Sequence, residues 1–200
     1  LGPGQEAPPS SPQTRWCRRR QRTRQRLRAL AVPRSEVTAF VALGANLGDA
    51  EQALRGALNA LDGTPGIRVG HASSLYRTAP IQSTGPDYVN AVAAVHSALG
   101  PHELLACLMR LEREGERQRP YRHAPRTLDL DLLWYGGHTC ETPALSLPHP
   151  RMMGRAFVLA PWLALLGQQG LNPAEACPDV AWPSAADLAH MTAQQGLWPI

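Results

Sequence analysis

Hydrophobic positions along the chain fall into four short segments of strand type. Residues 37–43 form a continuous apolar run, whereas residues 67–76, 88–96 and 127–135 alternate apolar with polar positions over part of their length. A short apolar run favours a buried strand, and alternation favours a strand with one face on a core. We therefore predict four strands at these positions.

Helical segments lie between and after the strands. Asp49 is a candidate N-cap for a helix to about residue 61, and Pro101 is suited to open a helix to about residue 114. We expect two further helices at residues 155–166 and 185–193. Because strands and helices alternate irregularly with short links, we predict an α+β fold with a mainly antiparallel sheet flanked by helices.

Residues 1–35 differ from the rest of the chain in composition and charge. They hold nine arginines and one acidic residue, a net charge of +8. Hydrophobic residues are too few to offset the entropy of ordering, so we expect this segment to be disordered. Two interpretations stay open: an arm that binds nucleic acid or an anionic surface, and an untidy or wrongly assigned N-terminus. We favour the second.

The composition of residues 36–200 limits the classes of function. This part carries 11 arginines and 15 acidic residues, a net charge of −4. That balance argues against the alternative that the chain is a nucleic-acid-binding module led by its basic tail. No apolar run reaches the roughly 18 residues of a membrane span. The cysteines lie far apart, so we expect no zinc site and a reduced, cytoplasmic protein.

The segment Asp129-Leu130-Asp131 places two carboxylates on one face of a strand. Carboxylates about 7 Å apart repel each other, and a cation beside them removes that cost. Mg²⁺ is suited to the position because it prefers oxygen ligands and completes its shell with water and phosphates. An ordinary solvated strand face is the alternative, and the motif alone does not decide between the two.

Arginines gather just before this strand, at Arg117, Arg119, Arg122 and Arg126. A guanidinium group matches the oxygens of a phosphate. Arginines that hold phosphate beside carboxylates that hold a metal indicate a phosphoryl or pyrophosphoryl transfer site. Surface arginines paired with nearby glutamates are the alternative. The chain has no lysine, which excludes a P-loop.

A second group of candidates is suited to a heterocyclic ligand. Tyr88 and Asn90 share one strand face, with Val89 on the other. An asparagine side chain offers a donor and an acceptor to the edge of a heterocycle, and Phe157 is a candidate to stack on its ring. In isolation, a polar strand face is the simpler interpretation of the first two residues.

Six blocks carry a family resemblance, which covers residues 37–166. They are VALGANLG at 41–48, SLYRT at 74–78, PDYVNA at 86–91, RPYRHAPRTLDLD at 119–131, LPHP at 147–150 and RAFV at 155–158. Together they resemble the 6-hydroxymethyl-7,8-dihydropterin pyrophosphokinases of folate biosynthesis. The resemblance implies a ferredoxin-like αβα sandwich. It also implies magnesium-dependent transfer of pyrophosphate from ATP to the hydroxymethyl group of the pterin, giving AMP and the pterin diphosphate.

The resemblance also implies roles for individual residues. Asp129 and Asp131 are expected to bind two Mg²⁺ ions that bridge the ATP phosphates, and Arg117 and Arg126 to stabilise the transferring groups. The expected contacts to ATP are Glu112, Arg119, Leu132, His149 and Arg155. The expected pterin pocket consists of Thr78, Ala79, Ile81, Tyr88, Asn90, His123 and Phe157. Loops at residues 79–87 and 116–126 are expected to close over the substrates.

Three positions depart from the family pattern. Glu116 stands where a glycine usually precedes the first arginine of the catalytic loop, His123 where some members have tryptophan, and Pro150 where others have tyrosine. We expect residues 36–170 to form the pterin pyrophosphokinase domain, residues 171–200 to be a C-terminal extension without an assigned role, and the protein to be a monomer.

Overall fold

The computed structural model describes residues 35–80, 85–116 and 128–200. Residues 36–200 form one compact unit. The centre of this unit is a six-stranded sheet in which every pairing is antiparallel. Its order is β5-β1-β4-β3-β8, with β2 also paired to β4. These strands are β1 (Val37–Ala45), β2 (Ile67–Ala72), β3 (Tyr76–Thr78), β4 (Tyr88–Ser97), β5 (Asp129–Tyr135) and β8 (Leu197–Pro199).

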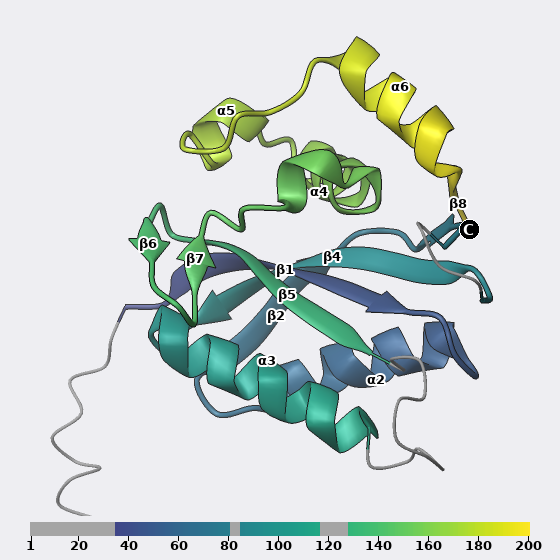
Figure 1. Cartoon of the computed structure of the whole chain (residues 1–200). Helices are drawn as coiled ribbons and strands as arrows, with labels where there is room; N and C mark the ends of the chain where they lie inside the picture. Colours follow the sequence, from purple (N-terminus) through teal and green to yellow (C-terminus); the bar gives the residue numbers. More distant parts are fainter. Residues whose placement is uncertain (1–34, 81–84, 117–127) are drawn as a thin grey trace, which may run out of the picture. The chain divides into compact units, whose positions relative to one another are not determined.

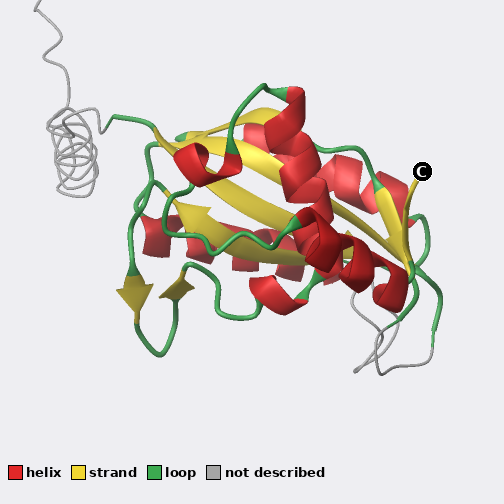
Figure 2. Cartoon of the chain, turned by 90° about the horizontal axis from the view of Figure 1, so that it is seen from above, coloured by secondary structure: helices red, strands yellow, loops and turns green. Residues whose placement is uncertain are grey.

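Helices cover both faces of the sheet (Figure 1). The face called lower here packs on α2 (Ala50–Asp62) and α3 (Pro101–Glu116). The opposite, upper face packs on α4 (Ala156–Gln168), which in turn contacts α6 (Ala185–Gln195). The view from above shows helices lying across the strands on this side (Figure 2). The remaining elements are the strands β6 (Cys140–Glu141) and β7 (Ser146–Leu147), the 3₁₀ helix η1 (Met152–Gly154) and α5 (Pro173–Ala176).

The two faces of the sheet bury two separate cores. In β1, Val41 and Leu43 point to the lower core, while Phe40 belongs to the upper one. Phe40 packs against Trp162 of α4, with 4.9 Å between ring centroids. Burial of this kind supplies most of the stability of such layers. The predicted α+β fold with a mainly antiparallel sheet between helices is therefore confirmed.

The predicted strand at residues 67–76 is wrong as a single element. The pairing of β2 with β4 shifts register between Val69 and His71, and β2 ends at Ala72. The Ser73 side-chain oxygen then accepts a hydrogen bond from the backbone N–H of Val92 at 3.1 Å, in place of a backbone partner. A strand paired with β4 begins again at β3, which extends two residues beyond the predicted end at residue 76.

Several other element boundaries differ from the prediction. Gly44, just beyond the predicted end of the first strand at residue 43, is the eighth residue of the long strand β1. Asp49 caps α2 as expected, since its carboxylate accepts from the N–H of Gln52 at 2.9 Å. The elements β6, β7, β8, η1 and α5 were not predicted, because each is only two to four residues long. Within the described residues, no helix has both the length and the apolar content to cross a membrane.

The last 30 residues pack on the upper layer. Cys177 and Val180 are buried in the upper core. The indole N–H of Trp134 donates to the Asp179 carboxylate at 2.6 Å, which ties this segment to β5. Beyond α6, β8 adds a strand to the edge of the sheet beside β3. These contacts make residues 171–200 part of the same compact unit.

Candidate active site

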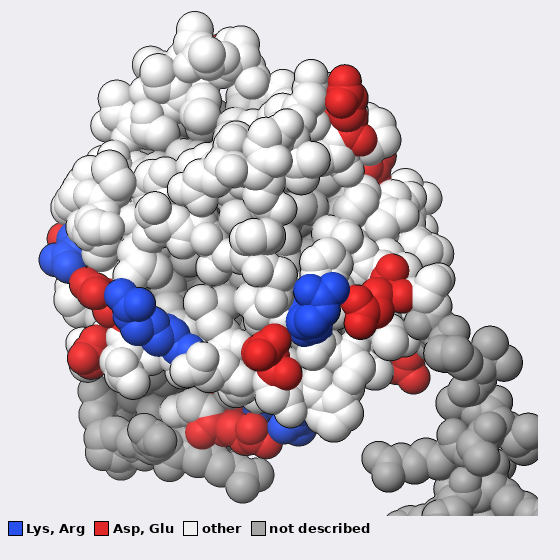
Figure 3. All heavy atoms as spheres, turned by 180° about the vertical axis from the view of Figure 1, so that it is seen from behind, with Lys and Arg blue, Asp and Glu red and all other residues white. Residues whose placement is uncertain are grey.

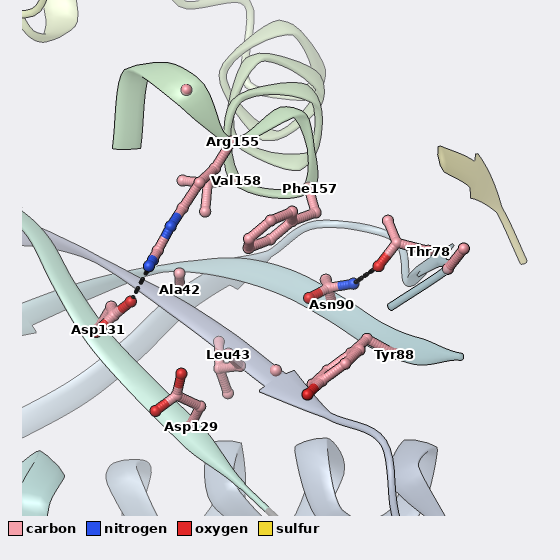
Figure 4. Close-up of a pocket in the computed structure, with 13 residues that line it drawn as sticks. Ala42, Leu43, Thr78, Tyr88, Asn90, Asp129, Asp131, Arg155, Phe157 and Val158 are labelled. Atoms are coloured by element: carbon pink, nitrogen blue, oxygen red, sulfur yellow. Dashed lines mark hydrogen bonds and ion pairs between the residues drawn. The ribbon is translucent and has the colours of Figure 1, made fainter. Parts of the chain in front are cut away.

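A cavity of about 380 Å³ lies on the upper face of the sheet, beside the start of α4 (Figure 4). Cavities of this size are typical of small-molecule sites. Strands β1, β3, β4 and β5 provide one side, and the junction between η1 and α4 provides the other. The lining residues are Ala42, Leu43, Gly44, Thr78, Ala79, Tyr88, Asn90, Asp129, Asp131, Gly154, Arg155, Phe157 and Val158.

Small residues of the central strand β1 form the middle of the cavity floor. Gly44 pairs with Asn90 of β4 on one side and with Asp129 of β5 on the other. Ala42, two residues earlier, pairs with Asp131. A Cβ atom on Gly44 would lie 3.4 Å from the side-chain oxygen of Asn90. The absence of larger side chains here leaves open space between an acidic end of the cavity and an amide end.

The acidic end is built by the alternation of β5. Asp129 and Asp131 line the cavity, whereas Leu130 between them is buried in the lower core. Glu112 of α3 holds this part of the strand from below, because its carboxylate accepts a hydrogen bond from the N–H of Leu130 at 2.7 Å. The two aspartates therefore project from a strand that Glu112 fixes to the lower helical layer.

Asp131 already has cationic and imidazole neighbours. Arg155, the residue before α4, donates a hydrogen bond to its carboxylate at 2.8 Å. The Nε2 atom of His149 lies 4.0 Å from the other carboxylate oxygen. Burial lowers the pKa of His149 below its usual value; the charge of Asp131 opposes this, while Arg155 and Arg151 add to it. His149 is therefore a neutral imidazole at pH 7, able to accept or donate a hydrogen bond.

The opposite end of the cavity combines a buried amide with an aromatic ring. Asn90 is 4% exposed, and its side-chain nitrogen donates to the hydroxyl of Thr78 at 3.0 Å. That bond fixes the amide, and its carbonyl oxygen is turned away from Thr78 (Figure 4). The guanidinium carbon of Arg155 lies 5.6 Å from the centroid of the Phe157 ring, within the range of a cation–π contact.

The acidic end is suited to a hard divalent cation. Asp129 and Asp131 offer only carboxylate oxygens to the cavity. In the described part of the chain, no group of three or more histidine, cysteine, aspartate or glutamate side chains is placed to hold a metal. Mg²⁺ is nevertheless usually bound by only one or two protein carboxylates, and its remaining ligands are water and substrate phosphates. The residues present therefore fit magnesium.

The family model of 7,8-dihydro-6-hydroxymethylpterin-pyrophosphokinase matches residues 40–167. The chain belongs to this family. It is 37% identical over 155 residues to 2-amino-4-hydroxy-6-hydroxymethyldihydropteridine pyrophosphokinase of Pseudomonas aeruginosa, covering 77% of this chain and 89% of that protein. This membership confirms the resemblance that the sequence blocks indicated.

Pyrophosphokinase relatives also occur within longer proteins. The chain is 41% identical over 128 residues to the mitochondrial folate synthesis bifunctional protein of Pisum sativum. The aligned residues make up 64% of this chain but only 25% of that protein. The fold of the chain also matches a crystal structure of Plasmodium falciparum HPPK-DHPS with a TM-score of 0.52 at 14% identity. That match covers 68% of this chain and 42% of the Plasmodium chain. The chain thus spans only part of these relatives, and the structural match supports the fold.

The residues expected from the pyrophosphokinase resemblance do not all line the cavity. Its lining includes most of the described candidates, namely Thr78, Ala79, Tyr88, Asn90, Asp129, Asp131, Arg155 and Phe157. Glu112 lies on α3 and holds β5, and the Leu132 side chain is 2% exposed in the lower core, facing away from the cavity. His149 contacts the cavity through Asp131. Six candidates lie outside the described residues: Ile81, Arg117, Arg119, Arg122, His123 and Arg126.

Five lining residues were missed by sequence reasoning: Ala42, Leu43, Gly44, Gly154 and Val158. None has a side chain with reactive chemistry. The alternate small residues Ala42 and Gly44 carried a usable signal, because small side chains at every second position of a strand leave one of its faces open. Gly154 and Val158 line the cavity because of how the junction between η1 and α4 is placed over the sheet.

Proposed function

We propose that this chain transfers a pyrophosphoryl group from ATP to the hydroxymethyl group of 6-hydroxymethyl-7,8-dihydropterin, with Mg²⁺ bound by Asp129 and Asp131. In this reaction the pterin hydroxyl oxygen forms a bond to the β-phosphorus of ATP. The bond from that phosphorus to the oxygen bridging it to the α-phosphorus breaks, AMP leaves, and the hydroxyl proton is released. The proposal is supported by family membership and by a cavity with an acidic and an amide end.

The single observation that carries the proposal is that these two ends share one cavity. A pterin needs a partner that both donates and accepts along its edge, and the held amide of Asn90 can serve there. Phe157 offers its ring for stacking. A pterin placed at this end directs its substituent along the floor toward Asp129 and Asp131, where a triphosphate chain would lie.

The described residues would act mainly by positioning and by balancing charge. Bound magnesium would neutralise negative charge on the phosphates and hold them in line with the attacking oxygen. Arg155 is placed to contact phosphate oxygens, since it already donates to a carboxylate oxygen at the acidic end. The neutral imidazole of His149 can add a hydrogen bond there. The roles of Arg117 and Arg126 stay predictions.

The folded unit offers no support for nucleic-acid binding as its function. Arginine and acidic side chains are intermixed on the face seen in Figure 3, over the described residues drawn there. Residues 36–200 carry a net charge of −4, whereas a nucleic-acid-binding surface is strongly basic.

Phosphorus NMR of the reaction products tests the proposed function. The protein is incubated with ATP, Mg²⁺ and 6-hydroxymethyl-7,8-dihydropterin, with each substrate omitted in turn as a control. We expect AMP and a pterin diphosphate to form together in equal amounts. Formation of ADP with a pterin monophosphate, or of AMP without the pterin, would contradict the proposal.

A further inference from the structure

The junction between α6 and β8 contacts residues that line the cavity. α6 ends at Gln195, and Gly196 follows in the left-handed conformation, with φ 58° and ψ 55°. This conformation is the usual helix C-cap for glycine, and it turns the chain into β8. The junction lies beyond residues 40–167, which carry the family match.

Gln195 joins this junction to one side of the cavity. Its side-chain oxygen accepts a hydrogen bond from the N–H of Ala156 at 2.8 Å, and its side-chain nitrogen donates to the carbonyl of Gly154 at 3.0 Å. The first N–H groups of a helix have no partner within the helix. Arg155, the N-cap of α4, makes no side-chain capping bond. Gln195 therefore caps α4 from a distant part of the sequence.

The next two residues join the junction to the other side of the cavity. Leu197 pairs with Thr78 in the β3–β8 ladder. A Cβ atom on Gly196 would lie 3.9 Å from the Cβ of Ala79, so the two backbones approach closely. Thr78 and Ala79 both line the cavity, as do Gly154 and Phe157 on the opposite side. Three consecutive residues thus bridge two sides that are not adjacent in sequence.

We propose that residues 195–197 act as a clamp that sets the width of the amide end of the cavity, with Gln195 as a positioning residue for the pterin. This inference rests on the proposed function. On one side of the cavity, the clamp holds the backbone of Gly154 and Ala156, which flank Arg155 and precede Phe157. On the other side, it holds Thr78, which accepts the hydrogen bond from Asn90. Loss of the Gln195 bonds frees the start of α4 and lets Phe157 move away from Thr78.

The two aspartates of the acidic end are anchored independently of the clamp. Asp129 and Asp131 belong to β5, which pairs with β1 on the far side of the sheet from β8. Arg155 lies between the two residues that Gln195 holds, but its own bond to Asp131 at 2.8 Å keeps its guanidinium group at the acidic end. A defect in the clamp should therefore weaken binding of the pterin much more than binding of the nucleotide. A residue that served stability alone would not produce this difference.

The test compares Gln195→Met, which keeps the side-chain length but removes both hydrogen bonds, with Gln194→Met on the exposed neighbour. Calorimetric titration measures the Kd for 6-hydroxymethyl-7,8-dihydropterin in the presence of a non-hydrolysable ATP analogue. We expect Gln195→Met to raise that Kd about tenfold, in keeping with the loss of two hydrogen bonds. The Kd for the ATP analogue alone should change less than about twofold, and Gln194→Met should change neither.

Gln195→Glu provides the rescue and a second route if the methionine variant folds poorly. It keeps an acceptor for Ala156, and a carboxylate is favoured near a helix N-terminus, so its Kd should lie between those of wild type and Gln195→Met. Amide hydrogen exchange at Ala156 should be faster in Gln195→Met and near normal in Gln195→Glu. Unchanged pterin affinity in both variants, with only a lower Tm, would overturn the clamp. Failure of the wild-type protein to bind the pterin would instead overturn the proposed function. In that case, amide exchange at Ala156 that is the same in Gln195→Met and wild type would refute the clamp separately.

Discussion

Arg155 donates a hydrogen bond to Asp131 at 2.8 Å, which joins the start of α4 to the acidic strand β5. The two side chains are 22% and 27% exposed, so this ion pair is partly accessible to solvent. One guanidinium thus neutralises part of the charge of Asp131, while it also contacts the Phe157 ring. A cation that binds Asp131 must share the carboxylate with Arg155 or displace it.

We expect Arg155→Ala to tighten the binding of a divalent cation to the protein without nucleotide. Removal of a positive charge next to Asp131 changes the cation's free energy by on the order of 1 kcal/mol near a surface, or about fivefold in Kd. Affinity for an ATP analogue should fall about tenfold, because a phosphate partner is lost. Mn²⁺ titration followed by electron paramagnetic resonance measures the first effect. Arg151→Ala, which removes an exposed arginine nearby, is the control. Weaker Mn²⁺ binding in Arg155→Ala would contradict this prediction.

The aspartate pair should be essential for turnover and dispensable for folding. Asp129→Ala and Asp131→Ala should each lower kcat by roughly a hundredfold or more, as expected when charge stabilisation of the transferring group is lost. Far-ultraviolet circular dichroism should be unchanged, because both side chains line the cavity and are not part of either core, and the Arg155–Asp131 pair that is lost in the second variant is partly exposed and contributes little to stability. Coupled measurement of AMP release gives kcat. Near-normal turnover of either variant at millimolar Mg²⁺ would remove that aspartate from the site.

Thr78 should control the pterin site through Asn90. Thr78→Val keeps the shape of the side chain but removes the hydroxyl that accepts from the buried Asn90 amide. An unsatisfied buried donor costs about 1–3 kcal/mol of unfolding free energy, and the released amide should also bind the pterin less well. Thr78→Ser retains the acceptor and is the matched control. Urea denaturation should give a lower free energy of unfolding, and pterin titration a weaker affinity, for Thr78→Val than for Thr78→Ser. Equal values for the two variants would show that the bond does not orient Asn90.

Features set by local sequence could be predicted. The apolar run of β1, the alternation of β5 and the Asp49 cap of α2 each depend on neighbouring residues, and all three are present in the fold. The shared orientation of Asp129 and Asp131 followed from alternation alone. Family blocks then added Arg155 and supported Phe157, and the α4 junction places both on the other side of the cavity.

Features set by distant contacts could not be predicted. The break between β2 and β3 depends on the bond from the Val92 N–H to Ser73, across 19 positions of sequence. The cap of α4 by Gln195 spans 39 positions, and no local pattern marks that glutamine as a cap. Gly44 was not predicted to line the cavity, because its role depends on which residues stand on the neighbouring strands. Local propensity carries no information about such register.

Cys177 should be inert to alkylation in the folded protein. Burial raises the pKa of its thiol to about 12, and Asp179 adds to the shift. The folded state therefore keeps a proton that the unfolded state loses near pH 9, so this residue makes the free energy of unfolding fall as pH rises from about 9 toward 12. At pH 8.5, iodoacetamide should label Cys140, which is half-buried, but not Cys177. Peptide mass spectrometry measures the labelling, with urea-unfolded protein as the control. Equal labelling of both native thiols would contradict the burial of Cys177.

Gly44 should determine the space available for the pterin. Its backbone conformation does not require a glycine. It lies in a regular strand, and its φ is not among the positive values of the chain. A Cβ atom there meets the Asn90 oxygen at 3.4 Å, which is an ordinary contact distance, so Gly44→Ala should fold with little loss of stability. The added methyl group fills the cavity floor, and we expect the KM for the pterin to rise several-fold with a smaller change in the KM for ATP. Gly44→Val, whose branched side chain suits a strand, should keep a similar Tm and abolish measurable pterin binding. Thermal unfolding and steady-state kinetics of the two variants provide the test. An unchanged pterin KM in Gly44→Val would show that the substrate does not lie over this part of the floor.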